Sequence, residues 1–365
     1  MKNMKKKSAI VTIYDPSFNY GNKLQNYASL FFLEKMGIDI VTLITPIQFK
    51  NRFLRIKIFL NKVTGLKLKG EVNQAHYKRG INFMSFNKRY LKPCNDLIRG
   101  TLDVHQYKYF FLGSDQVWNA TCYNEQNKQA FMLTFAESEQ KICLAPSFGV
   151  EALPREWEPW FKEQLATFPD LSVREEAGAK IIKDLTGREA TVLIDPTMML
   201  DRDEWNVIAK KPNRVDTSIP FILTYFLGKK SKRVTQDIEK IAQKYNFAVY
   251  NLLDISQLDM YASGPREFVY LFSKASLIMT DSFHGCVFSF LYDRPFLVYR
   301  REDNKADMFS RIEMLLKKFA ISRKYIDSGL ENELFEADYS EGKKLLEMER
   351  KKFKKYLIDS MKKGE

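Results

Sequence analysis

The alternation of short apolar segments with longer amphipathic ones is the feature of this sequence that most restricts its fold. The apolar segments have the length of buried strands, and the amphipathic ones have the period of helices. This order is typical of parallel sheets with helices on both faces. Strands are expected at 9–14, 40–44, 108–112, 141–145, 171–173, 191–194, 221–227, 248–253, 277–279 and 295–299, and the main helices at 23–36, 156–168, 175–185, 231–245, 265–273, 286–291, 308–319 and 341–361.

A polar stretch from Asp201 to Ser218 separates two such alternating series and predicts a domain junction. We expect an N-terminal α/β domain over 1–205, with a basic helical insertion over about 48–100, a C-terminal α/β domain over 206–340, and a C-terminal helix over 341–365. The hydrophobic content of 45% is enough for two full cores. The predicted fold class is α/β, with two doubly wound, Rossmann-like domains that face a cleft.

The ends of the apolar runs bear on localisation. The first run, after a basic N-terminus, stops at Asp15 and Pro16 and is too short for an export signal. No window approaches the roughly 18 apolar residues that a membrane-spanning helix requires. We therefore expect a cytoplasmic protein.

The chain has four cysteines, Cys94, Cys122, Cys143 and Cys286. They form no C-x-x-C pair and are expected to be reduced and mostly buried.

Positive charge is concentrated between Lys50 and Lys69, which holds seven Lys and Arg residues and no acid in a chain of net charge +13. Apolar residues recur there at steps of four and three, as in a basic amphipathic helix. One interpretation is a helix packed on its own domain with a solvated basic rim. The other is contact with an anionic membrane surface at the inner face of the membrane. Nucleic acid is not an expected partner, because no recognition motif is present.

Polar clusters follow several of the predicted strands. They are Asn19–Asn22, Gly113–Asn119, Ser147–Gly149, Arg174 and Asp281–Gly285. Such residues are common in turns of any kind. Ligands of open parallel sheets, however, bind beyond the carboxyl ends of the strands, where all five clusters are expected. Their shared location favours a binding site.

His284 is placed where a strand stops and a helix starts. Backbone N–H groups at a helix start, together with the helix dipole, favour phosphate or carboxylate. Ser282, His284 and Gly285 are therefore candidate anion-binding residues, and His284 could also supply a proton. The alternative is a structural histidine that satisfies a polar contact.

Arg174 ends a predicted strand and offers a planar fork that fits phosphate or carboxylate. The alternative is an ion pair with Glu175 or Glu176. Asp195, which precedes a proline, is interpreted as structural. The sequence shows no metal-ligand spacing, no P-loop and no Ser-His-Asp arrangement, so metal-independent chemistry on an anionic donor is expected.

A second group of candidate residues could bind a sugar. Asp115 and Gln116 combine hydrogen-bond acceptors and donors, and Trp118 offers an aromatic face beside them, although such sets also occur as helix caps. Another predicted loop contains Asn19, Gly21 and Asn22. Its glycine would let the backbone approach a ligand closely.

Five blocks in order resemble the motifs of the polysaccharide pyruvyl transferase family, over about residues 10 to 320. They are Asn19-Tyr20-Gly21-Asn22 with the following Leu24-Gln25-Asn26, Gly113-Ser114-Asp115-Gln116-Val117-Trp118-Asn119, Ser172-Val173-Arg174-Glu175, Asp195-Pro196-Thr197, and Thr280-Asp281-Ser282-Phe283-His284-Gly285. The resemblance implies a GT-B-like fold and transfer of pyruvate from phosphoenolpyruvate to a sugar of a cell-surface polysaccharide or its precursor. A cyclic ketal is the usual product, and no cofactor or metal is implied.

The roles that follow from this resemblance are specific. Arg174 would hold the carboxylate or phosphate of phosphoenolpyruvate, and the helix start at Ser282–Gly285 would hold the other anionic end. His284 would be the general acid or the charged phosphate partner. Asp115 and Gln116 would hold the acceptor, with Asp115 as the base, and the acceptor could be lipid-linked.

Two other functions fit the same pattern. A GT-B glycosyltransferase that uses a nucleotide sugar is one. A non-catalytic basic protein that binds glycan or membrane is the other.

Overall fold

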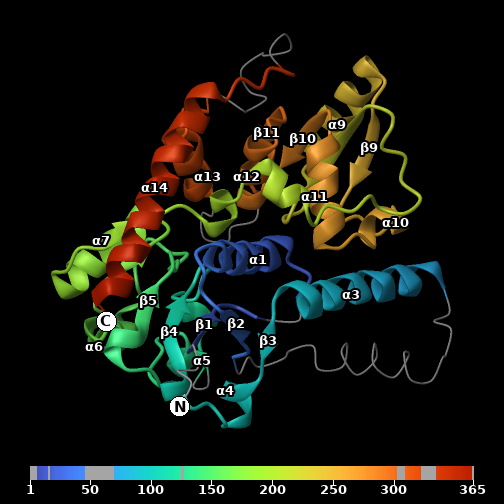
Figure 1. Ribbon diagram of the computed structural model, residues 1–365. Coiled ribbons are helices and arrows are strands. Elements are labelled where there is room, and N and C mark those ends of the chain that lie inside the picture. Colours follow the sequence, from blue (N-terminus) through green and yellow to red (C-terminus); the bar gives the residue numbers. More distant parts are fainter. Residues whose placement is uncertain are drawn as a thin grey trace. The chain divides into compact units, whose positions relative to one another are not determined.

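The computed structural model describes residues 6–14, 17–45, 70–124, 127–301, 309–321 and 334–363 (Figure 1). They divide into two compact units. The first unit takes its residues from Met1–Arg52, Asn87–Leu200 and Met348–Glu365, and the second from Phe53–Phe86 and Asp201–Glu347. The units are therefore interleaved along the chain, whereas the expected domain ranges were contiguous. The basic segment Lys50–Lys69 lies outside the described residues.

The first unit contains a parallel sheet of five strands in the order β3-β2-β1-β4-β5. Its strands are β1 (Lys7–Val11), β2 (Ile40–Leu43), β3 (Pro93–Cys94), β4 (Tyr107–Leu112) and β5 (Lys141–Cys143). Ile10 of β1 lies opposite Thr42 on one side and Phe111 on the other. Strands covered on both faces read as continuous apolar runs, which is how β1 and β4 appear in the sequence.

Helices and a short strand pair complete this unit. They are α1 (Tyr20–Lys35), α4 (Asp96–Arg99), α5 (Asn127–Ala130), α6 (Glu158–Ala166) and α7 (Glu176–Thr186), with β6 (Ser172–Val173) parallel to β7 (Thr191–Val192). Helix α1 begins three residues before the predicted start, because the Asn19 side chain accepts a hydrogen bond from the Asn22 N–H at 3.2 Å and caps the helix. Gly21 and Asn22 therefore lie in its first turn rather than in a loop.

The second unit contains a parallel sheet of four strands in the order β11-β10-β8-β9. The strands are β8 (Phe221–Tyr225), β9 (Ala248–Asn251), β10 (Leu277–Thr280) and β11 (Phe296–Val298). Its helices include α3 (Glu71–Tyr90, as far as Phe86), α8 (Arg202–Asn206), α9 (Lys232–Tyr245), α10 (Leu258–Tyr261), α11 (Pro265–Lys274), α12 (Phe283–Leu291) and α13 (Phe309–Lys318). The amphipathic α9 buries Val234, Ile238 and Ile241.

Helix α14 (Ser340–Lys363) contributes residues to both units. Its C-terminal part belongs to the first unit, where Arg350 donates hydrogen bonds to the carbonyl oxygens of Met198 and Leu200, each at 2.7 Å. Phe353 is fully buried, and its ring meets that of Phe32 edge-on.

The predicted α/β class with two doubly wound parallel sheets is confirmed. Each sheet has a switch point, where consecutive connections leave in opposite directions. In the first unit, β1 connects to β2 on one side while β4 lies on its other side. In the second, β8 connects to β9 while β10 lies on its other side. Ligands of such sheets bind beyond the strand ends at these points. Within the described ranges, no helix is both long and apolar enough to cross a bilayer.

Candidate active site

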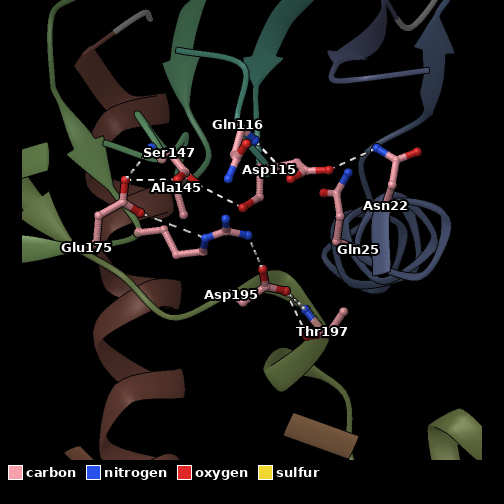
Figure 2. A network of polar contacts seen from close by, with 12 residues as sticks. Asn22, Gln25, Asp115, Gln116, Ala145, Ser147, Glu175, Asp195 and Thr197 are labelled. Atoms are coloured by element: carbon pink, nitrogen blue, oxygen red, sulfur yellow. Dashed lines mark hydrogen bonds and ion pairs between the residues drawn. The ribbon is translucent and has the colours of Figure 1, made fainter. Parts of the chain in front are cut away.

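The switch point of the first unit is bridged by side chains from α1 and from the loop after β4. The Asn22 side-chain amide donates to a carboxylate oxygen of Asp115 at 3.0 Å and to the carbonyl oxygen of Ile13 at 2.7 Å. Figure 2 shows Asp115 between Asn22 and Gln116, within a larger network of polar side chains. The structure thus brings together two of the predicted acceptor-binding residues, Asn22 and Asp115.

The backbone of the loop after β4 is strained where it presents Asp115. Asp115 has a φ of 65°, and Ala145, just after β5, has a φ of 51°. Residues other than glycine are uncommon in this left-handed region, and such strain is often stored at functional sites. The Ser147 N–H donates to the Asp115 carbonyl oxygen at 2.9 Å and ties the two strand ends together. Gly113 is required here, since a Cβ atom would lie 2.6 Å from the Leu144 carbonyl oxygen.

Arg174 lies behind this edge rather than on it. Its side chain is 4% exposed, and one guanidinium nitrogen lies 2.6 Å from a carboxylate oxygen of Asp195. Burial acts to lower the pKa of Arg174, but the carboxylates of Asp195, Glu175 and Asp115 outweigh it and raise that pKa. The fork that the sequence assigned to a donor therefore faces carboxylates of the protein. Asp195, taken as structural, is its main partner.

Glu175 and Asp195 hold the surrounding backbone. Glu175 accepts hydrogen bonds from the Ser147 hydroxyl at 2.8 Å and from the Phe148 N–H at 2.9 Å. Asp195 accepts from the N–H and the hydroxyl of Thr197 at 2.9 and 2.7 Å. The sequence offered Glu175 only as an alternative ion-pair partner of Arg174, and this ion pair is present, with Arg174 Nε 3.9 Å from Glu175 Oε2.

The other predicted acceptor-binding residues fall in different environments. Trp118 is fully buried among Phe148 and Phe168, and its indole N–H donates to the Phe131 carbonyl oxygen at 3.3 Å. It presents no face to a sugar, so that expectation is corrected: its apolar ring belongs to the core. Asn19 is exposed and caps α1.

Gln116 lies at the strand ends beside Asp115. Its side-chain oxygen accepts from Asn119 at 3.3 Å. Its amide also packs against Gly149, where a Cβ atom would lie only 2.7 Å from the Gln116 side chain.

In the second unit, the residues Ser282 to Gly285 form the start of α12. Ser282 caps the helix, and its hydroxyl accepts from the Gly285 N–H at 3.4 Å. The helix begins at Phe283, three residues before the predicted start, so His284 lies in the first turn, partly exposed, with its ring perpendicular to that of Phe283. Gly285 packs so closely on β10 that a Cβ atom would lie 2.3 Å from the Thr280 hydroxyl.

Asp281 connects three loops at the strand ends of this unit. One carboxylate oxygen accepts from the Leu227 N–H at 2.7 Å, and the other from the Gly228 N–H at 2.8 Å. The second oxygen also accepts from Arg301, beyond β11, at 3.0 Å. Asp281 was named only as part of the loop, and Arg301 was not predicted. The bonds fix the β8–α9 loop against the start of α12 at the switch point.

In the part of the chain that the structure describes, no cluster of three or more His, Cys, Asp or Glu side chains could hold a metal ion.

Comparison with known proteins gives one extensive match. The family model described as polysaccharide pyruvyl transferase matches residues 19–304. No curated protein matches the chain.

Similar solved structures include three proteins of low identity. UDP-GlcNAc 2-epimerase from Neisseria meningitidis, bound to UDP-GlcNAc, has a TM-score of 0.46 and 11% identity and covers 97% of this chain and 100% of its own. The glycosyltransferase SnogD from Streptomyces nogalater has a TM-score of 0.41 and 10% identity, with 96% and 95% covered. UDP-GlcNAc 2-epimerase from Methanocaldococcus jannaschii has a TM-score of 0.40 and 14% identity, with 93% and 92% covered.

Proposed function

This chain belongs to the polysaccharide pyruvyl transferase family, and we propose that it transfers pyruvate from phosphoenolpyruvate to a sugar of a cell-surface polysaccharide or its precursor. The observation that carries the proposal is His284 in the first turn of α12, at the switch point of a parallel sheet. A capped helix start there combines N–H groups, the positive end of a dipole and an imidazole, all suited to an anionic donor.

The donor is assigned to the second unit because of charge. Basic side chains occur at its strand ends, with Lys230 after β8 and Arg301, which pairs with Asp281, after β11. At the strand ends of the first unit, by contrast, three carboxylates surround the buried Arg174. A trianionic donor is stabilised near the basic side chains of the second unit and repelled by the carboxylates of the first unit. Arg174 is accordingly proposed to position Asp195 and Glu175, and the donor clamp predicted for it is not retained.

The sugar acceptor is assigned to the first unit. Among the residues that the structure describes, one carboxylate oxygen of Asp115 accepts from the Gln116 N–H at 2.9 Å and the other from Asn22 at 3.0 Å. An ionised carboxylate offers about four acceptor positions, so further positions remain for sugar hydroxyls. Asp115 is therefore proposed as the base that receives a hydroxyl proton, and Gln116 as an acceptor-binding neighbour.

The reaction balances without a cofactor. His284 donates a proton to the methylene carbon of phosphoenolpyruvate, which becomes a methyl group, and the carbon that bears phosphate becomes cationic. Two sugar hydroxyls form C–O bonds to that carbon in turn, and the bond to the phosphate oxygen breaks. Two hydroxyl protons are lost in total. One replaces the proton that His284 gave, and the other leaves with the phosphate.

A GT-B glycosyltransferase that uses a nucleotide sugar is the second candidate, because a capped helix start also suits a diphosphate. The experiment is to incubate the protein with phosphoenolpyruvate or a nucleotide sugar, with nitrophenyl or lipid-linked sugars as acceptors. Phosphate release that depends on the sugar, with a gain in acceptor mass equal to pyruvic acid less one water, supports the proposal. A gain of one hexose supports the glycosyltransferase. Absence of both products in all acceptors would leave a binding protein.

A further inference from the structure

Lys23 is a buried lysine beside the proposed acceptor site. It lies in the first turns of α1, and the residue is only 1% exposed. A buried ammonium group is costly unless it is paired with acceptors. Its Nζ atom donates to the side-chain oxygen of Asn22 at 2.9 Å, in a fully buried contact, and lies 5.8 Å from the centre of the Tyr14 ring. The function proposed above gives Lys23 no role.

The ammonium group determines which way the Asn22 amide points. An ammonium can only donate, so the Asn22 oxygen must face Lys23. The two amide protons then point away from Lys23, to the Ile13 carbonyl oxygen at 2.7 Å and to Asp115 at 3.0 Å. In the reversed orientation the amide oxygen would face a carbonyl and a carboxylate, and the NH₂ group would face a cation. All three contacts would become repulsive.

Asp115 in turn depends on Asn22. The Asn22 amide holds one carboxylate oxygen, while the Gln116 N–H holds the other at 2.9 Å. These two bonds fix the plane of the carboxylate on a residue whose backbone is already in a strained conformation. The direction of its remaining lone pairs is then set, which is the requirement for a base that must meet a particular hydroxyl.

We propose that Lys23 is a positioning residue that orients Asp115 through Asn22. This inference rests on the proposed function, because it assumes that Asp115 receives the acceptor proton. The hydrogen-bonded series Lys23–Asn22–Asp115 runs from a buried residue of α1 to the carboxyl ends of the strands. Lys23 acts on Asp115 through the Asn22 amide and does not touch the substrate.

The test compares Lys23→Met with Asn22→Leu and with the double variant. Methionine keeps most of the volume of lysine but cannot donate. Lys23→Met should lower kcat about 10- to 100-fold, as expected for loss of a hydrogen bond to a charged group, with the KM for phosphoenolpyruvate unchanged. In the Asn22→Leu background the same change should cause almost no further loss, because the two residues act in series. Lys23→Gln, which retains an N–H donor, should recover part of the activity.

Lys141 supplies a matched control. It is 5% exposed, and its Nζ atom donates to the Thr167 hydroxyl at 2.9 Å. Unlike Lys23, it lies at the amino end of a strand, β5, away from the carboxyl ends where the site is proposed. Lys141→Met should lower the melting temperature and leave kcat close to that of the wild type. Equal effects of the two lysine changes on kcat would show a general stability effect and overturn the proposal.

Two further results would overturn it. One is a folded Lys23→Met protein with normal kcat. The other is an effect of Lys23→Met that is as large in the Asn22→Leu background as in the wild type.

A crystal structure of Lys23→Met provides a test that does not depend on activity. The distance between the Asn22 amide nitrogen and the Asp115 carboxylate should increase beyond 3.5 Å, and an unchanged distance would refute the positioning role. Inactivity of the wild type with phosphoenolpyruvate would contradict the proposed function instead, and the crystal structure would still decide the role of Lys23.

Discussion

The side-chain amide of Asn22 lies 3.0 Å from the carboxylate of Asp115, although 93 positions separate the two residues in sequence. The bond joins the first turn of α1 to the loop after β4, at the switch point of the sheet. Both residues were candidates because they follow predicted strands and lie in blocks that resemble the family's motifs. The contact gives them a shared geometry, which makes their roles testable.

Replacing His284 with alanine should lower turnover with phosphoenolpyruvate by about 10²–10⁴-fold, the usual range for a positioned acid or base. The melting temperature should change little, because the residue is partly exposed at a helix start. Steady-state phosphate release and thermal melts measure the two effects. His105→Ala, at an exposed position, is the matched control and should match wild type in both. Normal turnover in folded His284→Ala protein would remove His284 from the mechanism.

Replacing Arg174 with methionine should destabilise the protein by about 3–5 kcal/mol, because it leaves Asp195 and Glu175 buried without their cation. Chemical denaturation measures the loss. The control is Arg202→Met, which removes an ion pair with Asp293 in which the arginine side chain is 56% exposed and should cost at most about 1 kcal/mol. A stable Arg174→Met protein with a greatly raised KM for phosphoenolpyruvate would instead restore the donor clamp.

Changing Asp281 to asparagine should weaken donor binding and cost about 1–3 kcal/mol of stability. The Leu227 and Gly228 N–H groups donate to different carboxylate oxygens, and asparagine would place an NH₂ donor opposite one of these two N–H groups. The expected signature is a higher KM for phosphoenolpyruvate with an unchanged KM for the sugar. Asp216→Asn, at an exposed carboxylate that accepts from Ser218, should change neither constant. An equal rise in both KM values would argue against a donor loop.

The thiols should differ in reactivity. Burial raises the pKa of Cys143 to about 12, and burial likewise raises the pKa of Cys286, while Cys94 is partly exposed. Only the thiolate is nucleophilic, so a thiol is unreactive at any pH well below its pKa. Iodoacetamide at pH values up to about 10 should therefore modify Cys94 and spare Cys143 and Cys286 in the folded protein. Mass spectrometry of tryptic peptides checks this, and unfolded protein, in which all three should react, is the control.

The sequence predicted the strands well and the helix starts less well. Strands β1, β4 and β8 are buried over most of their length, apart from Lys7 and Lys108, and their apolar runs leave little ambiguity. Helices α1 and α12 each begin three residues before the predicted start. Their first turns contain Gly21 and Gly285, and glycine disfavours helices unless caps such as Asn19 and Ser282 compensate.

Long-range pairing explains the remaining differences at the site. Arg174 has two acidic neighbours in sequence, yet its closest ion pair is with Asp195, 21 positions away. Only the pairing of β6 with β7 brings those residues together. Trp118 lies between Val117 and Asn119 in a mostly polar stretch, and this sequence context could not reveal that its ring is turned into the core.

The interleaving of the two units affects how the protein is made. A ribosome delivers α1, β4 and β5 well before the segment of α14 that covers Phe32 and binds the carbonyl groups of Met198 and Leu200. The first unit therefore cannot complete its core until α14 has been synthesised. A truncation that removes the residues from Met348 onwards would consequently uncover Phe32 of α1, more than 300 positions earlier in the sequence.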